Sequence, residues 1–115
     1  MTEACLFCRI ARGEIPATIV HEDDEVVAFR DVNPQAPTHV LVIPREHLSS
    51  AADLAADHAE LLAAMFAAAN RVAAADGVAE TGYRLVVNVG RDAGQSVDHL
   101  HLHVLGGRRL AWPPG

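Results

Sequence analysis

The sequence predicts an α+β domain in which an antiparallel sheet of about five strands packs against one long helix, with a short helix near the N-terminus. Two observations carry this prediction. Short β-prone runs bounded by Gly, Pro and acidic residues recur along the chain, and a single long stretch has the apolar spacing of a helix. The 115 residues suffice for one core, so residues 1–115 are predicted to form a single domain.

The N-terminal part of the chain is typical of a short helix followed by a hairpin. Residues 5–10 are mostly apolar, and residues 12–16 (Arg-Gly-Glu-Ile-Pro) form a break, which predicts a short helical turn ending at Gly13. Residues 18–21 and 26–31 are β-prone and are separated by the acidic residues 22–25. They are therefore predicted to pair as a β-hairpin.

Prolines delimit the third predicted strand. Because Pro34 and Pro37 lack amide donors, residues 33–37 are predicted to form a loop. The apolar run 38–43 that follows is predicted to be a strand, and Pro44 closes it.

The long helix is predicted to begin near Asp57 and to end at Gly77. Asp57 and Glu60 have the spacing of a capping box, and Gly77 suits a C-terminal cap. The apolar residues that recur at helical spacing between them are Leu61, Leu62, Met65, Phe66, Ala69 and Val72.

The last part of the chain predicts two further strands joined by a loop. Residues 83–89 form one β-prone run, residues 90–96 are rich in loop formers, and residues 99–105 form the second run. A tail, residues 106–115, follows.

Charge and composition exclude several classes of function. The net charge of −6 and the pI near 5.5 disfavour binding to a nucleic acid polymer, although a local pocket can still hold a small nucleotide. All nine basic residues are arginine, which excludes a Schiff-base lysine and the P-loop lysine. No apolar run reaches the ~18 residues that span a bilayer, and the N-terminus does not resemble a secretion signal. We therefore expect a cytoplasmic protein without membrane contact.

Three histidines alternate with apolar residues in the last predicted strand. Side chains two apart share one face of a strand, so His99, His101 and His103 face one way and the leucines between them face the other. Same-face residues lie ~6.6 Å apart along a strand. Because zinc–nitrogen bonds are only ~2.0–2.1 Å long, one metal ion shared by all three rings would be strained. The alternatives are that His101 performs chemistry while its neighbours orient it or serve a separate site, or that the imidazoles merely occupy a half-exposed face.

Residues 99–105 match the pattern His-φ-His-φ-His-φ-φ, with φ apolar, at every position. The chain thereby resembles the histidine-triad (HIT) superfamily, and segments along nearly its whole length are similar to the nucleotide-binding HINT-like branch. These segments are residues 15–17, 22–24, 28–31, 34–39, 42–44, 86–88, 94–96 and 106–107, together with the terminal Trp112-Pro113-Pro114-Gly115. The resemblance implies that the predicted sheet of about five strands, the long helix and the short N-terminal helix are arranged as in the HIT fold.

The resemblance also implies a hydrolase that converts a purine nucleoside 5′-monophosphoramidate or an aminoacyl-adenylate to the nucleoside monophosphate. His101 would attack the α-phosphorus and form a nucleotidyl-histidine that water then hydrolyses, a role for which neutral imidazole is well suited near pH 7. His39 and His103 would hold the tautomer of His101 and share charge around the phosphoryl group. Ser96 would stabilise phosphate oxygens or assist the leaving amine.

The nucleotide-binding residues follow from the same resemblance. Gly94, Gln95 and Ser96 would meet the phosphate together with His101 and His103, Asn88 would face it, and Asp31 would accept the ribose hydroxyls. The base would lie among Phe7, Ile10, Phe29, Val32 and Leu41. Without the resemblance, Asp31 is typical of a turn, the five apolar residues are typical of a core, and residues 94–96 are an ordinary loop.

Cys5 and Cys8 form a C-x-x-C pair, which supplies two thiolates of a tetrahedral zinc site. His47 and His99 are the other ligands we select, and the resemblance supports them because several bacterial members bind zinc through a similar set. Such a zinc ion would be structural, so no cofactor is expected for the chemistry. The alternative is two free, partly buried cysteines. His21 and His58 have no partner in either interpretation and are expected to be solvated surface residues.

The resemblance implies two partners: a purine nucleotide substrate and a second copy of the chain, paired through the long helix and a sheet edge. Three rival functions remain at this point. The first is a dinucleoside-polyphosphate hydrolase or nucleotidyl transferase of the same superfamily, and the second is a non-catalytic nucleotide-binding regulatory module. The third is a metal-dependent hydrolase that uses the histidines as ligands.

Overall fold

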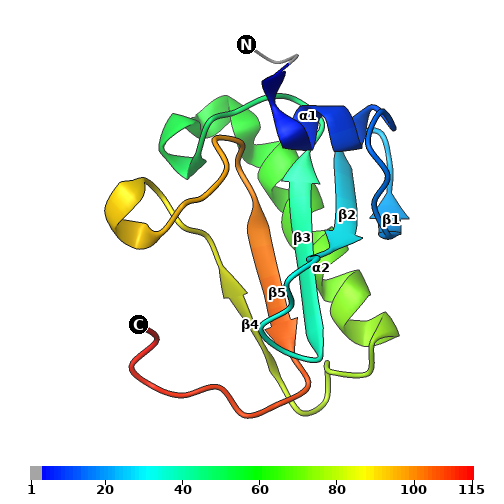
Figure 1. The fold of residues 1–115 in the computed structure, drawn as a ribbon, viewed down its shortest axis with the longest axis vertical. Helices are drawn as coiled ribbons and strands as arrows, with labels where there is room; N and C mark the ends of the chain where they lie inside the picture. The colour runs from blue at the N-terminus through cyan, green and yellow to red at the C-terminus, as the bar shows by residue number, and fades with distance from the viewer. Residues whose placement is uncertain (1–3) are drawn as a thin grey trace.

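The structure, a computed structural model, describes residues 4–115 and contains a five-stranded antiparallel sheet with two α-helices (Figure 1). Strand neighbours follow the order β1-β2-β3-β5-β4. The predicted fold class is confirmed. In chain order the elements are α1 (Leu6–Ala11), β1 (Ile19–Glu22), β2 (Val26–Arg30), β3 (Thr38–Pro44), α2 (Ala59–Ala75), β4 (Tyr83–Val86) and β5 (Leu102–Gly106), with short 3₁₀ turns at Ala51–Asp53, Ala56–His58 and Arg91–Ala93. Within residues 4–115, neither helix is long and apolar enough to cross a membrane.

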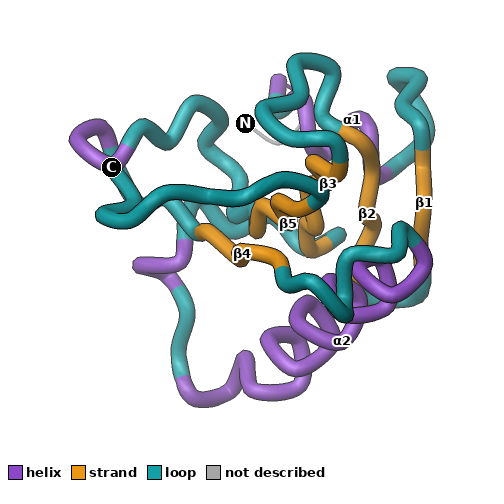
Figure 2. The backbone as a smooth tube through the Cα atoms, turned by 90° about the horizontal axis from the view of Figure 1, so that it is seen from below, coloured by secondary structure: helices purple, strands orange, loops and turns teal. Residues whose placement is uncertain are grey.

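The long helix α2 packs against one face of the sheet (Figure 2). Its buried residues recur three or four positions apart and so form one stripe along the helix. The strands contribute every second residue to the same core, because successive side chains point to opposite faces. The buried members of this core include Val26, Ala28, Val40, Val42, Leu61, Met65, Ala69, Val72, Leu100, Leu102 and Val104.

The opposite face of the sheet is only partly covered. Phe29 of β2 and Leu41 of β3 point to this side and pack with Phe7 and Ile10 of α1 in a second apolar cluster. The six-residue α1 lies at one end of β2 and β3 (Figure 1), so the rest of this face is left to other side chains. We call this side of the sheet the histidine face.

The histidine strand is shorter than the sequence predicts. It begins at Leu102 instead of residue 99, and the backbone N–H groups of His99 and Leu100 donate instead to the carbonyl oxygens of Val97 (2.8 Å) and Leu48 (2.7 Å). The register that pairs Val42 with Leu102 would set Leu100 opposite Pro44, which has no N–H for the ladder. Pro44 itself remains within β3, and β4 ends at Val86 instead of residue 89.

Two local expectations, the Asp57 capping box and the solvated surface histidines, are wrong. The helix begins at Ala59 without the Asp57 capping box, and the Nδ1 of His58 accepts the N–H of Ala55 (3.0 Å) one turn earlier. Leu62 and Phe66 flank the buried stripe and are each 41% exposed. His21 and His58 are half-buried, and His21 lies 2.9 Å from an Asp23 carboxylate oxygen, so neither is a free surface residue.

A bidentate ion pair joins the sheet to the end of α2. The guanidinium of Arg30 donates to both carboxylate oxygens of Asp76 (2.8 and 2.9 Å), and the hydroxyl of Thr38 donates to the same carboxylate (2.9 Å). This carboxylate therefore holds the last residue of β2 and the first residue of β3 against the C-cap of α2.

Candidate functional site

Three imidazole rings gather on the histidine face, because β3 and β5 pair there. The register sets His39 opposite Leu105 and Leu41 opposite His103, which makes His39 and His103 diagonal neighbours across the two strands. Their ring centroids lie 5.2 Å apart, and those of His101 and His103 lie 5.1 Å apart. Leu100, Leu102 and Val104 point the other way into the α2 core, as the alternation predicts.

Backbone hydrogen bonds fix which nitrogen of His39 and His103 carries the proton. The N–H of Gln35 donates to Nδ1 of His39 (3.0 Å), so the neutral ring carries its proton on Nε2. That Nε2 donates to Nδ1 of His103 (2.9 Å), which leaves the proton of His103 on its own Nε2. This N–H is buried and has no hydrogen-bond partner among residues 4–115.

Burial keeps both rings neutral near pH 7. Desolvation lowers the pKa of His39, and the carboxylate of Asp31, 3.4 Å from its Nε2, offsets this only in part. Desolvation, with repulsion from His101 and His39, lowers the pKa of His103 to about 4. The buried N–H of His103 is therefore a neutral donor that lacks an acceptor.

His101 is held in the opposite tautomer. Its Nδ1 lies 2.7 Å from the carbonyl oxygen of His99, and since a carbonyl only accepts, Nδ1 carries the proton. The Nε2 of the neutral ring then keeps its lone pair. The ring is 4% exposed, and the edge of Phe7 packs against it with centroids 5.2 Å apart, which restricts its rotation. The site therefore sets a nucleophilic nitrogen next to an N–H donor.

Two cavities meet at His103. The larger, which we call the apolar cavity, has a volume of about 390 Å³ and is lined by Leu6, Phe7, Ile10, Ile15, Pro16, Ala17, Phe29, Arg30, Asp31, Val32, Leu41, Ser96, Val97, His101 and His103. A second cavity of about 200 Å³ is lined by Gln35, His39, Val86, Asn88, His103 and Leu105. An apolar cavity with one carboxylate and two imidazoles suits a ligand with a planar ring, hydroxyl groups and an anionic group.

The cavities contain most of the residues that the sequence singles out. The five apolar residues selected for the base, together with Asp31, Ser96 and both histidines, line the apolar cavity, and Asn88 lies in the smaller one. Val32 is fully exposed and so lies at the rim. Sequence reasoning missed Gln35, whose backbone orients His39, because no motif marks a loop amide.

Gly94 and Gln95 line neither cavity. The side-chain oxygen of Gln95 accepts the N–H of Gly90 (2.9 Å), and its amide nitrogen donates to the carbonyl oxygens of Ser49 (2.7 Å) and Val97 (3.0 Å). Gly94 adopts the left-handed conformation, with φ of 87°. The side chain of Gln95 therefore braces the loop that carries Ser96.

The two cysteines and two further histidines form a separate cluster, which we call the cysteine–histidine cluster. The ligand atoms of Cys5, Cys8, His47 and His99 all lie within 4.8 Å of one another. Nδ1 of His99 lies 3.4 Å from Sγ of Cys5 and 3.5 Å from Sγ of Cys8, while Nδ1 of His47 lies 3.2 Å from Sγ of Cys8. His99 thus lies apart from the other two histidines of its run and serves a different site.

The geometry of this cluster fits a tetrahedral zinc ion. Zinc–sulfur and zinc–nitrogen bonds of about 2.3 and 2.0–2.1 Å, at tetrahedral angles, put sulfur and nitrogen about 3.5 Å apart, close to the observed separations. Nε2 of His99 donates to the carbonyl of Pro44 (2.8 Å), so the lone pair of Nδ1 points at the sulfur atoms. Burial, with the Cys5 thiol, raises the pKa of Cys8 to about 11, so metal binding would release this proton.

Comparison with known proteins gives concordant results. A family model described as HIT domain matches residues 12–110. A purine nucleoside phosphoramidase of Escherichia coli (strain K12) is 48% identical over 110 residues, which cover 96% of this chain and 92% of that protein. The crystal structure of a HIT family hydrolase from Legionella pneumophila Philadelphia 1 is 56% identical with a TM-score of 0.95, and covers 96% of this chain and 99% of that chain. That of a Zn-bound histidine triad family protein from Mycobacterium smegmatis is 34% identical with a TM-score of 0.81, over 94% and 78% of the two chains.

The low pKa of His103 predicts how protonation will depend on pH. Its folded-state pKa, about 4, lies below the ordinary value of 6.5, so the unfolded chain binds more protons between these values. The stability from this group is present above about pH 6.5 and is lost as the pH falls toward 4. We expect the ring Cε1 proton of His103 to show no titration by NMR above pH 5. A midpoint near 6.5 would contradict the neutral donor.

Proposed function

The chain belongs to the HIT family, and from the geometry of its site we propose that it hydrolyses purine nucleoside 5′-monophosphoramidates or aminoacyl-adenylates, releasing the nucleoside monophosphate. One observation carries this proposal. The buried, unpaired N–H of His103 lies beside the Nε2 lone pair of His101, and both rings line the apolar cavity. A donor without an acceptor is destabilising in a buried site, and a phosphoryl oxygen would supply the acceptor.

The reaction we propose has two displacements at phosphorus. In the first, Nε2 of His101 forms a bond to the α-phosphorus, and the bond from phosphorus to the leaving group breaks. The leaving group departs with its electron pair: a phosphoramidate releases an amine, which takes up a proton, and an aminoacyl-adenylate releases the carboxylate of the amino acid. In the second, water attacks the same phosphorus, the bond to His101 breaks, and the imidazole recovers its lone pair. Ser96 assists the leaving amine, and its place in the lining of the apolar cavity supports this role.

The remaining roles follow from the chemistry of the lining. His103 donates its N–H to a non-bridging phosphoryl oxygen, and His39 holds His103 in the tautomer that can do so. Asp31 accepts the two ribose hydroxyls, and Asn88 contacts the phosphate from the smaller cavity. The base lies among the apolar residues that line the cavity beside α1. Gly94 and Gln95 contribute to the phosphate site by positioning Ser96.

We also propose that the cysteine–histidine cluster holds a structural zinc ion. The donor set, the sulfur–nitrogen separations and the oriented lone pair of His99 support this assignment. The M. smegmatis relative described as Zn-bound adds to this support. Cys5 and Cys8 are free thiols, which a reducing compartment such as the cytoplasm keeps available for a metal. All four protein ligands are used, so no open position remains for catalysis.

We further propose that the protein is a homodimer, paired through α2 and the edge strand β4. Leu62 and Phe66, each 41% exposed, lie on one side of α2 in line with Asn70, which accepts a hydrogen bond from Tyr83 of β4. The exposed stripe therefore runs beside β4, whose outer edge has backbone groups outside the ladder. An apolar stripe continuous with a free sheet edge is suited to a second copy of the chain.

The first prediction concerns the nucleophile. Replacing His101 with Ala should lower kcat/KM for adenosine 5′-phosphoramidate by at least about 10³-fold, because the covalent route is lost. His21→Ala, which removes an imidazole outside both cavities, should leave turnover unchanged. A rapid quench followed by mass spectrometry should detect a nucleotidyl adduct on the wild type only.

Three results would contradict this assignment. Normal turnover in His101→Ala would exclude His101 as the nucleophile. Faster turnover of diadenosine tetraphosphate than of the phosphoramidate would favour the polyphosphate hydrolase. Tight binding of AMP with no turnover of either compound would favour the regulatory module.

The second prediction concerns the metal. Purified protein should contain about one zinc ion per chain, and a strong chelator should lower the Tm while leaving turnover at 25 °C unchanged, because the ion holds structure. Cys8→Ser should lower both zinc content and Tm, whereas the control His58→Ala, which removes an imidazole outside the cluster, should leave the zinc content unchanged. Loss of turnover on chelation, with the fold intact, would favour the metal-dependent hydrolase.

The third prediction concerns the dimer. Sedimentation should give a mass near twice the 12.2 kDa of the chain, and Phe66→Arg should shift the equilibrium to the monomer by placing a charge in the apolar interface. Val20→Arg, on the opposite edge strand β1, is the control and should remain dimeric. An unchanged mass for Phe66→Arg would mean that this stripe is not the interface.

A further inference from the structure

The carboxylate of Asp31 lies beside both the apolar cavity and the imidazole of His39. It is the one acidic group in the lining of that cavity among residues 4–115. Its Oδ2 lies 3.4 Å from Nε2 of His39, and this Nε2 carries the proton that His39 donates to Nδ1 of His103, 2.9 Å away. A single N–H of His39 therefore has two acceptors near it, an imidazole nitrogen and a carboxylate oxygen.

The backbone holds Asp31 and His39 in fixed orientations. The N–H of Asp31 donates to the carbonyl oxygen of His39 (3.0 Å), which extends the pairing of β2 with β3 by one residue. The N–H of Asn33 donates to Oδ1 of Asp31 (2.8 Å), and the N–H of Gln35 donates to Nδ1 of His39 (3.0 Å). One short loop thus orients both side chains, and it leaves Oδ2 of Asp31 directed at the histidine.

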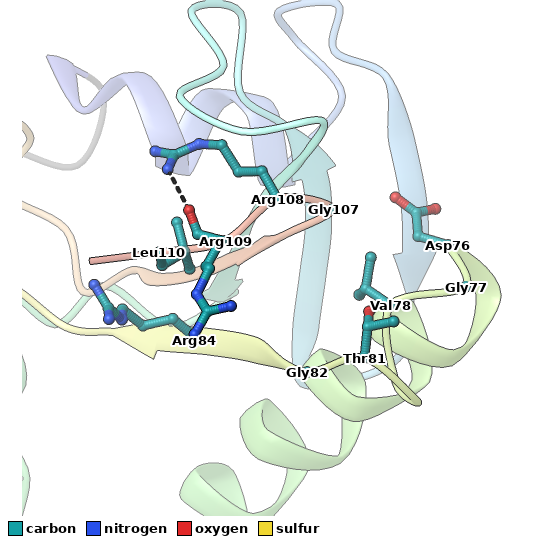
Figure 3. Close-up of a pocket in the computed structure, with 10 residues that line it drawn as sticks. All are labelled: Asp76, Gly77, Val78, Thr81, Gly82, Arg84, Gly107, Arg108, Arg109 and Leu110. Atoms are coloured by element: carbon teal, nitrogen blue, oxygen red, sulfur yellow. Dashed lines mark hydrogen bonds between the residues drawn. The ribbon is translucent and has the colours of Figure 1, made fainter. Parts of the chain in front are cut away.

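Two contacts with distant segments keep this loop in place. The strand residues at its two ends, Arg30 and Thr38, both donate to the carboxylate of Asp76. The guanidinium of Arg108 donates to the carbonyl oxygen of Gln35 (3.0 Å). Figure 3 shows Asp76 at the end of α2 and Arg108 on the chain after β5. The separation between Asp31 and His39 is therefore a property of the fold and does not depend on the loop alone.

The charge of Asp31 reaches both imidazoles. The side chains of Asp31 and His39 are only 20% and 5% exposed, so water screens their interaction little. Desolvation lowers the pKa of His39 and the pKa of His103, and the charge of Asp31 acts in the opposite direction on both. A change in the state of this carboxylate is thus felt at His103, although Asp31 acts on it through His39.

Hydrogen bonds in such a chain polarise one another. When Nδ1 of His103 accepts a stronger hydrogen bond, the N–H on the other side of the same ring becomes a stronger donor. A free carboxylate beside the N–H of His39 attracts this N–H and weakens the bond to His103. Two hydroxyl groups that donate to the carboxylate would satisfy its oxygens and reduce that attraction. The donor strength of His103 therefore depends on whether Asp31 is occupied.

We propose that Asp31 is a positioning residue as well as a ribose ligand: when the two ribose hydroxyls bind its carboxylate, the N–H of His39 is released to His103, and His103 donates more strongly to the phosphoryl oxygen. This inference rests on the proposed function and adds that the reaction centre responds to the sugar. Because the donor of His103 stabilises charge in the transition state, the hydroxyls should raise kcat as well as affinity. The site would then select ribonucleotides in the reaction step itself.

Two nucleosides without a phosphate test this coupling separately from catalysis. Adenosine and 2′,3′-dideoxyadenosine are each added to saturation to the full ¹⁵N-labelled chain, in its solution oligomeric state, and the ring nitrogens of His103 are followed by NMR. Both nucleosides should shift the amide signals of Phe29 and Leu41, which line the apolar cavity. Only adenosine should shift the Nδ1 and Nε2 signals of His103.

The variant Asp31→Asn should lose the response of His103 to adenosine. Asparagine keeps a side-chain oxygen for the N–H of Asn33 but removes the charge beside His39. The matched control is Asp24→Asn, which removes an exposed carboxylate outside both cavities and should respond as the wild type does.

Turnover supplies a second measurement. With the wild type, kcat for the 2′,3′-dideoxy analogue of adenosine 5′-phosphoramidate should be about fivefold lower than kcat for the ribose compound, which is the size of one hydrogen bond's net contribution. With Asp31→Asn the two kcat values should be nearly equal, because no carboxylate remains for the hydroxyls to occupy. Asp24→Asn should keep the wild-type ratio.

Several outcomes would overturn the proposal. Equal shifts of His103 with the two nucleosides in the wild type would do so, as would a response to adenosine that persists in Asp31→Asn. Loss of the hydroxyls that raises KM with kcat unchanged would show that Asp31 binds the ribose without acting on His103. Should Asp31→Asn fail to fold, the two nucleosides compared in the wild type decide the matter alone.

Failure of the proposed function would look different. If His103 responds to adenosine alone but no phosphoramidate is hydrolysed, the coupling is supported and the proposed reaction is contradicted. If neither nucleoside shifts Phe29 or Leu41, the base site is contradicted, and the coupling is overturned with it.

Discussion

The pairing of β3 with β5 is the interaction on which the rest of the site depends. These two strands lie at the centre of the sheet order, and their register brings His39 of one beside His103 of the other. On the opposite face the same pairing buries Val40, Val42 and Val104 beneath α2. A slip of one residue would move the imidazoles into that core and the apolar residues into the site. The burial that holds the fold therefore also determines which side chains reach the ligand.

Backbone groups, more than side chains, decide what each imidazole can do. The amide of Gln35 puts the proton of His39 on Nε2, from which His39 donates to His103. The carbonyl of His99 puts the proton of His101 on Nδ1, so the Nε2 of His101 keeps its lone pair. These tautomers therefore depend on the backbone segments around Gln35 and His99 keeping their positions. The loop before β3 is held at its strand end by the bond from Thr38 to Asp76, and Arg30 ties the neighbouring strand to the same carboxylate.

Short-range patterns in the sequence were sufficient to predict the strands, the long helix and the alternation of residues 99–104. They could not predict where β5 begins, because that depends on Pro44, which the register sets opposite Leu100 from more than fifty positions away. The side chain of Gln95 bonds to the backbone of Ser49, 46 positions away, and the amide of Gln35 reaches the ring of His39 only because the loop before β3 folds back on that strand. Tertiary geometry of this kind leaves no periodicity in the sequence. The C-x-x-C pair was informative as half of a ligand set, and the fold brings His47 and His99 to it.

The helix α1 links the two halves of the histidine run. Its six residues are too few for a helix to be stable alone, so its position is set by contacts with the rest of the chain. On one side Phe7 and Ile10 form part of the apolar cavity, and on the other side Cys8, with the N-cap Cys5, meets His99. The carbonyl of that same His99 holds His101 in its tautomer. A structural ion at the cysteine–histidine cluster would thus fix the wall of the base site and the orientation of the nucleophile together, although it would touch neither the base nor the phosphorus.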